Sequence, residues 1–402
     1  MLGALAEGVT EVRGFLNGDD CRCTLKAFEA MGVRIEQTGP TALQLHGVGL
    51  HGLRAPASAL DLGNSGTSMR LMSGLMCAQG FSTTLTGDAS LSRRPMKRII
   101  DPLAQMGAKI DSVDGHAPLT ILPAGGLKGI AYRSPVASAQ VKSGILLAGL
   151  YANGTTTVTE PEASRDHTER MLRSFGVTVD ASPGQATLLG GQALRATAIK
   201  VPADISSAAF FMVAAAIVPG SQILLQDVGV NPTRTGIIEI LCAMGAQIEL
   251  LNRRNFGAEP VADIRVRGGV LRGIRIGRER VASAIDEFPA VFVAAACAEG
   301  ITEVSGAEEL RVKESDRIQT MVDGLAVLGI KALARADGAR IEGGRPGGGV
   351  IDSHGDHRVA MSFAIAALRA TAPITILDCA NVNTSFPGFA ELARGSGLGI
   401  SS

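Results

Sequence analysis

The chain has 402 residues, which is too long for one ordinary hydrophobic core, so two domains are expected. Its 38 basic and 38 acidic side chains balance, which excludes a strong net attraction to nucleic acid or to an anionic membrane. The apolar runs at 210–218 and 290–298 are far shorter than a membrane span.

The six cysteines show no metal-ligand spacing, and three of them lie in apolar helical patterns. This usage favours reduced thiols and a reducing compartment. The first residues, MLGALAEGVTEVR, lack the basic start of a secretory signal. We therefore expect a cytoplasmic protein with neither a nucleic acid nor a membrane as partner.

One pattern recurs along the chain: a small-residue apolar helix, a glycine turn, a β-prone run, a polar loop, and a second helix that ends in Met-Gly or a near variant. Glycine suits these turns because it tolerates positive φ. Six copies predict six equivalent α/β packing units. They occupy residues 2–37, 69–112, 144–181, 210–250, 291–334 and 360–397.

Three copies lie on each side of the segment VPADISS, Val201–Ser207. We therefore predict an α/β fold with two similar globular domains of three units each, residues 1–203 and 204–402. The hinge is expected near Ala203. An active site is expected in the cleft between the two domains.

A polar or small segment with a capping residue precedes each first helix from the second copy onward. Free N–H groups at helix N-termini attract anions, so aligned helices would present several anion-binding ends to one cleft. The first copy lacks such a segment because Met1 falls inside its helix. We therefore expect roughly a dozen or more residues to be absent ahead of Met1.

Candidate anion-binding side chains follow in the first half of the chain. A basic cluster after GDASLS suits either a phosphate clamp or an ordinary basic surface: Arg93, Arg94, Lys97 and Arg98. Ser138 and Gln140 stand at the head of an apolar helix, where capping alone would explain the serine. Arg165, in SRDHTER, precedes an amphipathic helix.

The most charged stretch is LRVKESDR, Leu310–Arg317. On a helix Lys313 and Arg317 share one face, with Glu314 and Asp316 beside it. This arrangement suits a phosphate or carboxylate ligand that also exchanges a proton. The alternative is a solvated helix face with surface ion pairs.

Further candidates lie around the last two first-helix starts. Asp286 and Glu287 stand where a helix cap is needed, and Asp286 could instead take a proton from a substrate hydroxyl. Arg358 follows a capping aspartate in SHGDHR and is interpreted as an anion contact. The spacing of His354 and His357 is not a zinc pattern, so we expect no metal.

Six motifs in this order resemble those of the 5-enolpyruvylshikimate-3-phosphate synthase family: LGNSGTSMR, GDASLSRRPM, SAQVKS, NPTRTG, LRVKESDR and GDHR. The resemblance runs from Met1 to about Ala393. It implies inverse α/β-barrel domains of βαβαββ units, with the first unit truncated. It also implies a monomeric enzyme of the shikimate pathway, the glyphosate target, which transfers the enolpyruvyl group of phosphoenolpyruvate to the 5-hydroxyl of shikimate 3-phosphate without a cofactor.

The resemblance also implies roles for individual residues. Shikimate 3-phosphate would be held by Ser138, Gln140, Arg165, Asp286 and Lys313. Phosphoenolpyruvate would be held by Gly66, Arg94, Gln140, Arg317 and Arg358. Asp286 would act on the substrate hydroxyl, while Glu314 and Lys313 would handle protonation of the methylene carbon.

The chain departs from the family pattern at its start, where family members carry a strand and a PGDKSxSxR-like segment. Loss of such a charged contact would cost about several kcal/mol of transition-state stabilisation, so we expect impaired activity. One alternative is a non-catalytic truncated relic. Another is a UDP-N-acetylglucosamine enolpyruvyl transferase, which uses a loop cysteine that GDASLSRRPM lacks.

Overall fold

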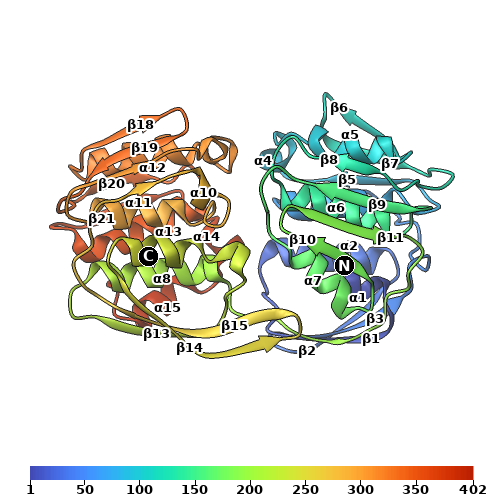
Figure 1. Ribbon diagram of the computed structural model, residues 1–402, viewed down its shortest axis with the longest axis horizontal. Helices are drawn as coiled ribbons and strands as arrows, with labels where there is room; N and C mark the ends of the chain where they lie inside the picture. Colours follow the sequence, from blue (N-terminus) through green and yellow to red (C-terminus); the bar gives the residue numbers. More distant parts are fainter. Residues whose placement is uncertain (402) are drawn as a thin grey trace. The chain divides into compact units, whose positions relative to one another are not determined.

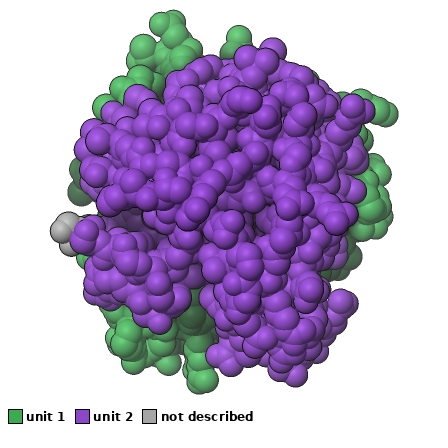
Figure 2. Space-filling view, turned by 90° about the vertical axis from the view of Figure 1, so that its left-hand side faces the viewer, with its two compact units in different colours: residues 1–201, 256–258 green, residues 202–255, 259–402 purple. Residues whose placement is uncertain are grey.

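The computed structural model describes residues 1–401, which divide into two compact units (Figures 1 and 2). Unit 1 comprises Met1–Val201 with Phe256–Ala258, and unit 2 comprises Pro202–Asn255 with Glu259 and the residues after it. The main division therefore falls between residues 201 and 202, next to the expected hinge.

Unit 1 contains three open four-stranded sheets, ordered β12-β1-β3-β2, β4-β5-β7-β6 and β10-β11-β9-β8. In each sheet one edge pair is parallel, and the other pairs are antiparallel. The strands are β1 (Glu7–Arg13), β2 (Arg34–Gly39), β3 (Ala42–Val48), β4 (Leu60–Asp61), β5 (Thr83–Thr86), β6 (Lys109–Val113), β7 (His116–Leu122), β8 (Ala131–Arg133), β9 (Thr155–Thr159), β10 (Val179–Ser182), β11 (Gln185–Leu189) and β12 (Ala198–Lys200).

The helices of unit 1 supply much of its core, because α3 and α6 are buried and pack against each other. Their crossing needs glycine, since a Cβ on Gly74 would overlap the carbonyl oxygen of Gly144. The helices are α1 (Leu2–Leu5), α2 (Asp19–Ala30), α3 (Gly66–Met76), α4 (Ala89–Ser92), α5 (Lys97–Gln105), α6 (Ala139–Gly149) and α7 (His167–Ser174).

Unit 2 repeats this plan with sheets of unequal size, ordered β13-β15-β14, β16-β17-β19-β18 and β20-β21. The first of these is antiparallel between β13 and β15, whereas the pairs β16-β17 and β20-β21 are parallel. The strands are β13 (Gln222–Gly229), β14 (Gln247–Phe256), β15 (Glu259–Arg267), β16 (Arg275–Ile276), β17 (Ile301–Val304), β18 (Ala332–Arg335), β19 (Gly338–Glu342), β20 (Gly349–Asp352) and β21 (Ile374–Leu377).

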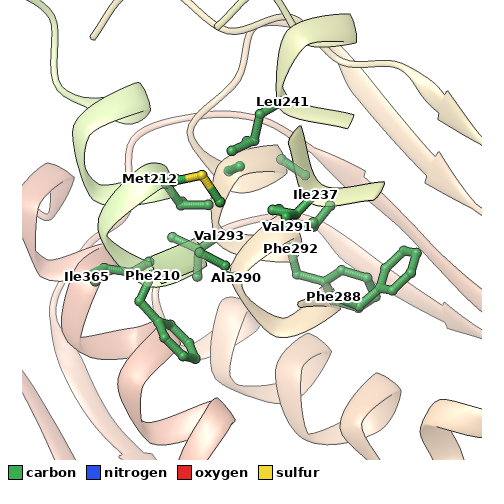
Figure 3. Packing of buried hydrophobic residues seen from close by; sticks show 14 of the residues in the cluster. Phe210, Met212, Ile237, Leu241, Phe288, Ala290, Val291, Phe292, Val293 and Ile365 are labelled. Atoms are coloured by element: carbon green, nitrogen blue, oxygen red, sulfur yellow. The ribbon is translucent and has the colours of Figure 1, made fainter. Parts of the chain in front are cut away.

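The core of unit 2 forms where α8, α11 and α13 pack against one another. Figure 3 shows side chains of these helices gathered in one apolar cluster, among them Phe210, Met212, Phe292, Val293 and Ile365. Each such side chain contributes roughly 1.5–3 kcal/mol by burial. The helices are α8 (Ile205–Ile217), η1 (Pro232–Arg234), α9 (Gly236–Ala243), α10 (Arg278–Val281), α11 (Phe288–Ala296), η2 (Glu308–Val312), α12 (Arg317–Val327), α13 (His357–Ala366), η3 (Ala367–Arg369), α14 (Val382–Ser385) and α15 (Phe389–Gly395).

The predicted sixfold repeat is confirmed. Each first helix (α1, α3, α6, α8, α11 and α13) leads into a strand (β1, β5, β9, β13, β17 and β21). The glycine after each second helix has a positive φ, from 77° to 99°, at Gly32, Gly107, Gly176, Gly245, Gly329 and Gly397. Only glycine adopts this conformation without strain, which explains the Met-Gly signature.

Candidate active site

Two arginines converge on the N-terminus of α3 in unit 1. Ser65 caps this helix by accepting from the backbone N–H of Ser68. A Cβ on Gly66 would lie 3.1 Å from Nη1 of Arg70 and 3.2 Å from Nη1 of Arg94. Two guanidinium groups beside a helix N-terminus create a strongly anion-attracting position.

Arg70 links this position to Gln140 at the start of α6. Its Nη1 donates to Oε1 of Gln140 over 2.6 Å, and Nε2 of Gln140 donates to Thr67 Oγ1 over 2.8 Å. The sequence reasoning missed Arg70 as a candidate. It lies four residues after Gly66 within the motif LGNSGTSMR, so helical spacing could have placed it on the same face.

Glu160 holds two of the predicted substrate segments in unit 1. Its Oε1 accepts from the backbone N–H of Ser138 over 2.7 Å. Its two carboxylate oxygens accept from Ser164 Oγ over 2.8 and 2.7 Å, and Ser164 directly precedes the half-buried Arg165. The predicted capping role of Ser138 is confirmed, because its Oγ accepts from the backbone N–H of Val141.

Behind these residues lies a buried ionic cluster that sequence reasoning did not identify. Nζ of Lys142 is 3.0 Å from Glu160 and 3.0 Å from Glu169, and the three side chains are 4%, 1% and 2% exposed. Burial alone would lower the pKa of Lys142, but the two carboxylates outweigh it and raise that pKa. Lys142 is therefore a buried, charged lysine.

Arg317 is the centre of a second buried cluster, in unit 2. Its side chain is 2% exposed, with Nε 2.8 Å from Asp356 and Nη2 2.6 Å from Glu314. Burial by itself would raise the pKa of Asp356, but Arg317 lowers it to about 2. The alternative of a solvated helix face is wrong for this residue.

Asp286 brings the predicted residues of unit 2 together. Its Oδ1 lies 3.7 Å from Nη1 of Arg317 and 3.8 Å from Nζ of Lys313. Its backbone oxygen accepts from Nη1 of Arg358 over 3.0 Å. Since Glu314 is bonded to Arg317, all five predicted residues of this half form one continuous cluster.

Two local expectations for this cluster are wrong. Lys313 and Arg317 do not share a helix face, because Lys313 is extended after η2, and α12 begins only at Arg317, where Asp316 caps it. The two cations therefore reach Asp286 from different segments. Glu287 occupies the N-cap position of α11 without a side-chain cap bond.

Glu287 instead points into a buried polar contact next to Asp286. Its carboxylate accepts from Ser206 Oγ, which in turn accepts from Nη2 of Arg234. Burial raises the pKa of Glu287, although Arg234 lies 3.7 Å away and opposes this effect. Arg234 belongs to the motif NPTRTG, so this motif supports the segment that carries Asp286.

The family model for "EPSP synthase (3-phosphoshikimate 1-carboxyvinyltransferase)" matches residues 1–392. The chain belongs to the EPSP synthase family. A relative from Methylococcus capsulatus named 3-phosphoshikimate 1-carboxyvinyltransferase is 64% identical, over 100% of this chain and 92% of the relative. A relative of the same name from Alkalilimnicola ehrlichii is 60% identical, over 100% of this chain and 90% of the relative.

Solved structures of EPSP synthase family members have the same fold as this chain. The structure of EPSP synthase from Acinetobacter baumannii has a TM-score of 0.90 and 57% identity, covering 99% of this chain and 92% of that chain. A second structure of EPSP synthase from Acinetobacter baumannii has a TM-score of 0.90 and 55% identity, covering 100% of this chain and 93% of that chain. The predicted enolpyruvyl-transferase type of α/β fold is therefore confirmed. The expectation of a missing first segment stays a prediction.

Within this EPSP synthase family chain, the structure gathers the predicted residues in two groups, one in each unit. Of the basic cluster after GDASLS, only Arg94 lies at Gly66, and it donates to Asn64 Oδ1 over 2.5 Å. Its neighbours Arg93, Lys97 and Arg98 lie outside this group and fit the alternative of an ordinary basic surface.

Residues 1–401 contain no group of three or more His, Cys, Asp or Glu side chains arranged to bind a metal ion. Burial, with help from the neighbouring Arg358, lowers the pKa of His357 to about 4. His357 is therefore neutral near pH 7 and leaves Arg358 and Arg317 as the cations beside it. No helix within the same residues has the length and apolarity required to cross a bilayer.

Proposed function

We propose that this chain transfers the enolpyruvyl group of phosphoenolpyruvate to the 5-hydroxyl of shikimate 3-phosphate. The products are 5-enolpyruvylshikimate 3-phosphate and phosphate, a step of the shikimate pathway towards aromatic amino acids. One observation carries the proposal: the match at 64% identity over the whole chain to a relative named 3-phosphoshikimate 1-carboxyvinyltransferase. Neither a cofactor nor a metal takes part in the reaction as proposed.

Phosphoenolpyruvate is the more highly charged partner for its size, and we assign to it one arginine of unit 1 and two arginines of unit 2. Arg94 would bind it in unit 1, together with Gly66 and Gln140. Arg317 and Arg358 would bind it in unit 2. The closeness of two guanidinium groups to Gly66 supports this assignment, because an anion placed there would offset their mutual repulsion. Arg70 would orient Gln140 from behind.

Shikimate 3-phosphate is assigned to two uncharged donors, two cations and the carboxylate of Asp286. Ser138, Gln140 and Arg165 would bind it from unit 1, while Lys313 and Asp286 would bind it from unit 2. We expect a monomer. We also expect a cytoplasmic location, which the six unpaired cysteines of the described residues favour.

The chemistry follows from the surroundings of Asp286. Its carboxylate would accept the proton of the 5-hydroxyl as that oxygen bonds to C2 of phosphoenolpyruvate. Lys313 and Glu314 would deliver a proton to C3, which gives a tetrahedral intermediate. Lys313 and Glu314 would then take a proton back from C3 as the bond between C2 and the phosphate ester oxygen breaks. Phosphate leaves, with Arg317 and Arg358 stabilising its charge.

The test is to incubate the chain with both substrates, to follow phosphate release and to identify the product by ³¹P NMR. The Asp286→Asn variant is expected to bind shikimate 3-phosphate but to lose turnover by about 10²–10⁴-fold, because it cannot accept the proton. UDP-N-acetylglucosamine serves as the control acceptor. Turnover of that acceptor but not of shikimate 3-phosphate would overturn the proposal in favour of the alternative transferase.

A further inference from the structure

We propose that Glu160, locked in place by Lys142 and Glu169, is a positioning residue for the acceptor substrate. It sets the backbone at Ser138 and the loop that carries Arg165, and thereby the binding of shikimate 3-phosphate. The inference rests on the proposed function, since it assigns Ser138 and Arg165 to that substrate. It concerns a buried cluster that would itself touch neither substrate.

Several hydrogen bonds and an ion pair end on the carboxylate of Glu160. Glu160 follows β9 and is 1% exposed. It accepts from the N–H of Ser138 and from Ser164 Oγ, and it pairs with Lys142. Charge-assisted bonds to a buried carboxylate are short and directional, so the two segments that it joins have little freedom to move apart.

The two helices that follow these segments, α6 and α7, are also joined to each other. Lys142 on α6 pairs with Glu169 on α7 over 3.0 Å. Beside this pair, Ser143 Oγ and Thr168 Oγ1 are 2.7 Å apart. The starts of α6 and α7 are thus joined by two adjacent polar contacts, and Arg165 lies in the short loop that enters α7.

One lysine between two buried carboxylates is an expensive way to hold a core together, because apolar side chains of similar volume are often equally stabilising or more so. Here the cluster directly contacts two segments that are assigned to one substrate. Its geometric role explains why a charged cluster occupies a position that stability alone would leave to apolar residues.

The test compares Glu160→Gln with Glu162→Gln, a matched change at an exposed residue two positions along the chain. Whichever way the new amide turns, an NH₂ group takes the place of one carboxylate oxygen of Glu160. At least one of the contacts with Ser138, Ser164 or Lys142 then loses its acceptor. We expect the Kd and KM for shikimate 3-phosphate to rise about 10- to 100-fold, with KM for phosphoenolpyruvate changed less than about twofold. Glu162→Gln should match the wild type in calorimetry and kinetics.

A second variant separates positioning from folding: Lys142→Met, Glu160→Gln and Glu169→Leu combined. It replaces all three charged side chains by neutral ones, so no buried charge is left without a partner. We therefore expect urea unfolding close to that of the wild type, with shikimate 3-phosphate binding still weakened. Wild-type binding by either folded variant, or an equal rise in KM for both substrates, would overturn the positioning role. If the wild-type chain itself bound no shikimate 3-phosphate, the proposed function would fall as well, which is a distinguishable result.

Discussion

The two units each bury one cation among carboxylates, but they use it differently. In unit 1, Lys142 is enclosed by Glu160 and Glu169, one layer behind the residues assigned to substrate. In unit 2, Arg317 is itself a candidate substrate residue and contacts Asp356, Glu314 and Asp286. Burial alone therefore does not separate a supporting ion pair from one that is assigned to a substrate.

The chemistry of the two cations accounts for the difference. The planar guanidinium of Arg317 is held by Asp356 and Glu314 through Nε and Nη2, while Nη1 points towards Asp286. The ammonium of Lys142 is a point charge between two carboxylates. The guanidinium group can therefore be fixed through two of its nitrogens and still contact another group through the third. The ammonium group of Lys142 only holds its two carboxylates together.

The largest effect should follow from Arg317→Lys. A lysine cannot reproduce the two anchoring bonds and the third contact together, so we expect kcat/KM to fall about 10³-fold, or roughly 4 kcal/mol. Steady-state kinetics measures this loss, and Arg335→Lys, at a side chain that is 42% exposed, is the control. Retention of kcat/KM within tenfold would mean that the two clusters do not differ as described.

A second large effect is expected on stability in unit 1. Lys142→Met leaves two carboxylates buried without their cation, which should lower the free energy of unfolding by about 3–5 kcal/mol. Urea denaturation followed by circular dichroism measures the change. Lys331→Met, at an exposed ion pair with Glu342, should cost at most about 0.5 kcal/mol. Equal losses in the two variants would contradict the buried, charged state of Lys142.

The pH dependence of the free energy of unfolding should also distinguish the two clusters. His357 has a pKa near 6.5 when unfolded and about 4 when folded, so between these values the unfolded chain binds more protons. Stability should therefore fall as the pH drops from about 6.5 to 4, by about 2 kcal/mol once partial exposure is allowed for. His357→Gln should flatten this part of the curve, and an unchanged slope would disprove the assignment.

Asp356 extends the acid sensitivity of unit 2 to lower pH. Its folded pKa of about 2 lies below the ordinary value of 3.8, so its contribution is present above about pH 4 and is lost towards pH 2. The raised pKa of Lys142 has the opposite sign: its contribution is complete below the ordinary lysine pKa and is lost as the pH rises through its higher folded value. The stability linked to Asp356 is thus lost in acid, whereas the stability linked to Lys142 is lost in base.

The smallest effect is predicted for Gly66→Ala. The new methyl group would press on the ends of two flexible side chains, Arg70 and Arg94, which can move by a few tenths of an ångström. We expect KM for phosphoenolpyruvate to rise about three- to tenfold, with KM for shikimate 3-phosphate nearly unchanged. A larger effect on shikimate 3-phosphate would place Gly66 next to the other substrate.

The repeat was predictable because its signals are local. A helix that must reverse within one residue requires positive φ, and glycine supplies it at every second-helix end. The prediction that Lys313 and Arg317 share a helix face was wrong because α12 begins only at Arg317, with Asp316 as its cap, and Lys313 lies before it. A regular charge spacing does not reveal such a break.

The buried partners of Lys142 could not be predicted from the sequence, for a different reason. A single lysine in an apolar helix usually extends its amine to solvent. Its burial here depends on Glu160 and Glu169, which belong to a later loop and a later helix. Only tertiary packing brings these groups together, so no pattern within α6 could have indicated them. The same holds for the contact between Arg70 and Gln140.

The first sheet of unit 1 bears on how the chain folds during synthesis. Its edge strand β12 pairs in parallel with β1, joining Glu11 to Ala198 and Arg13 to Lys200. A ribosome adding about 5–20 residues per second would release β12 roughly ten to forty seconds after β1. Throughout that delay one edge of β1 has no partner strand, so the nascent chain must shield an open edge until the end of unit 1 emerges and seals it.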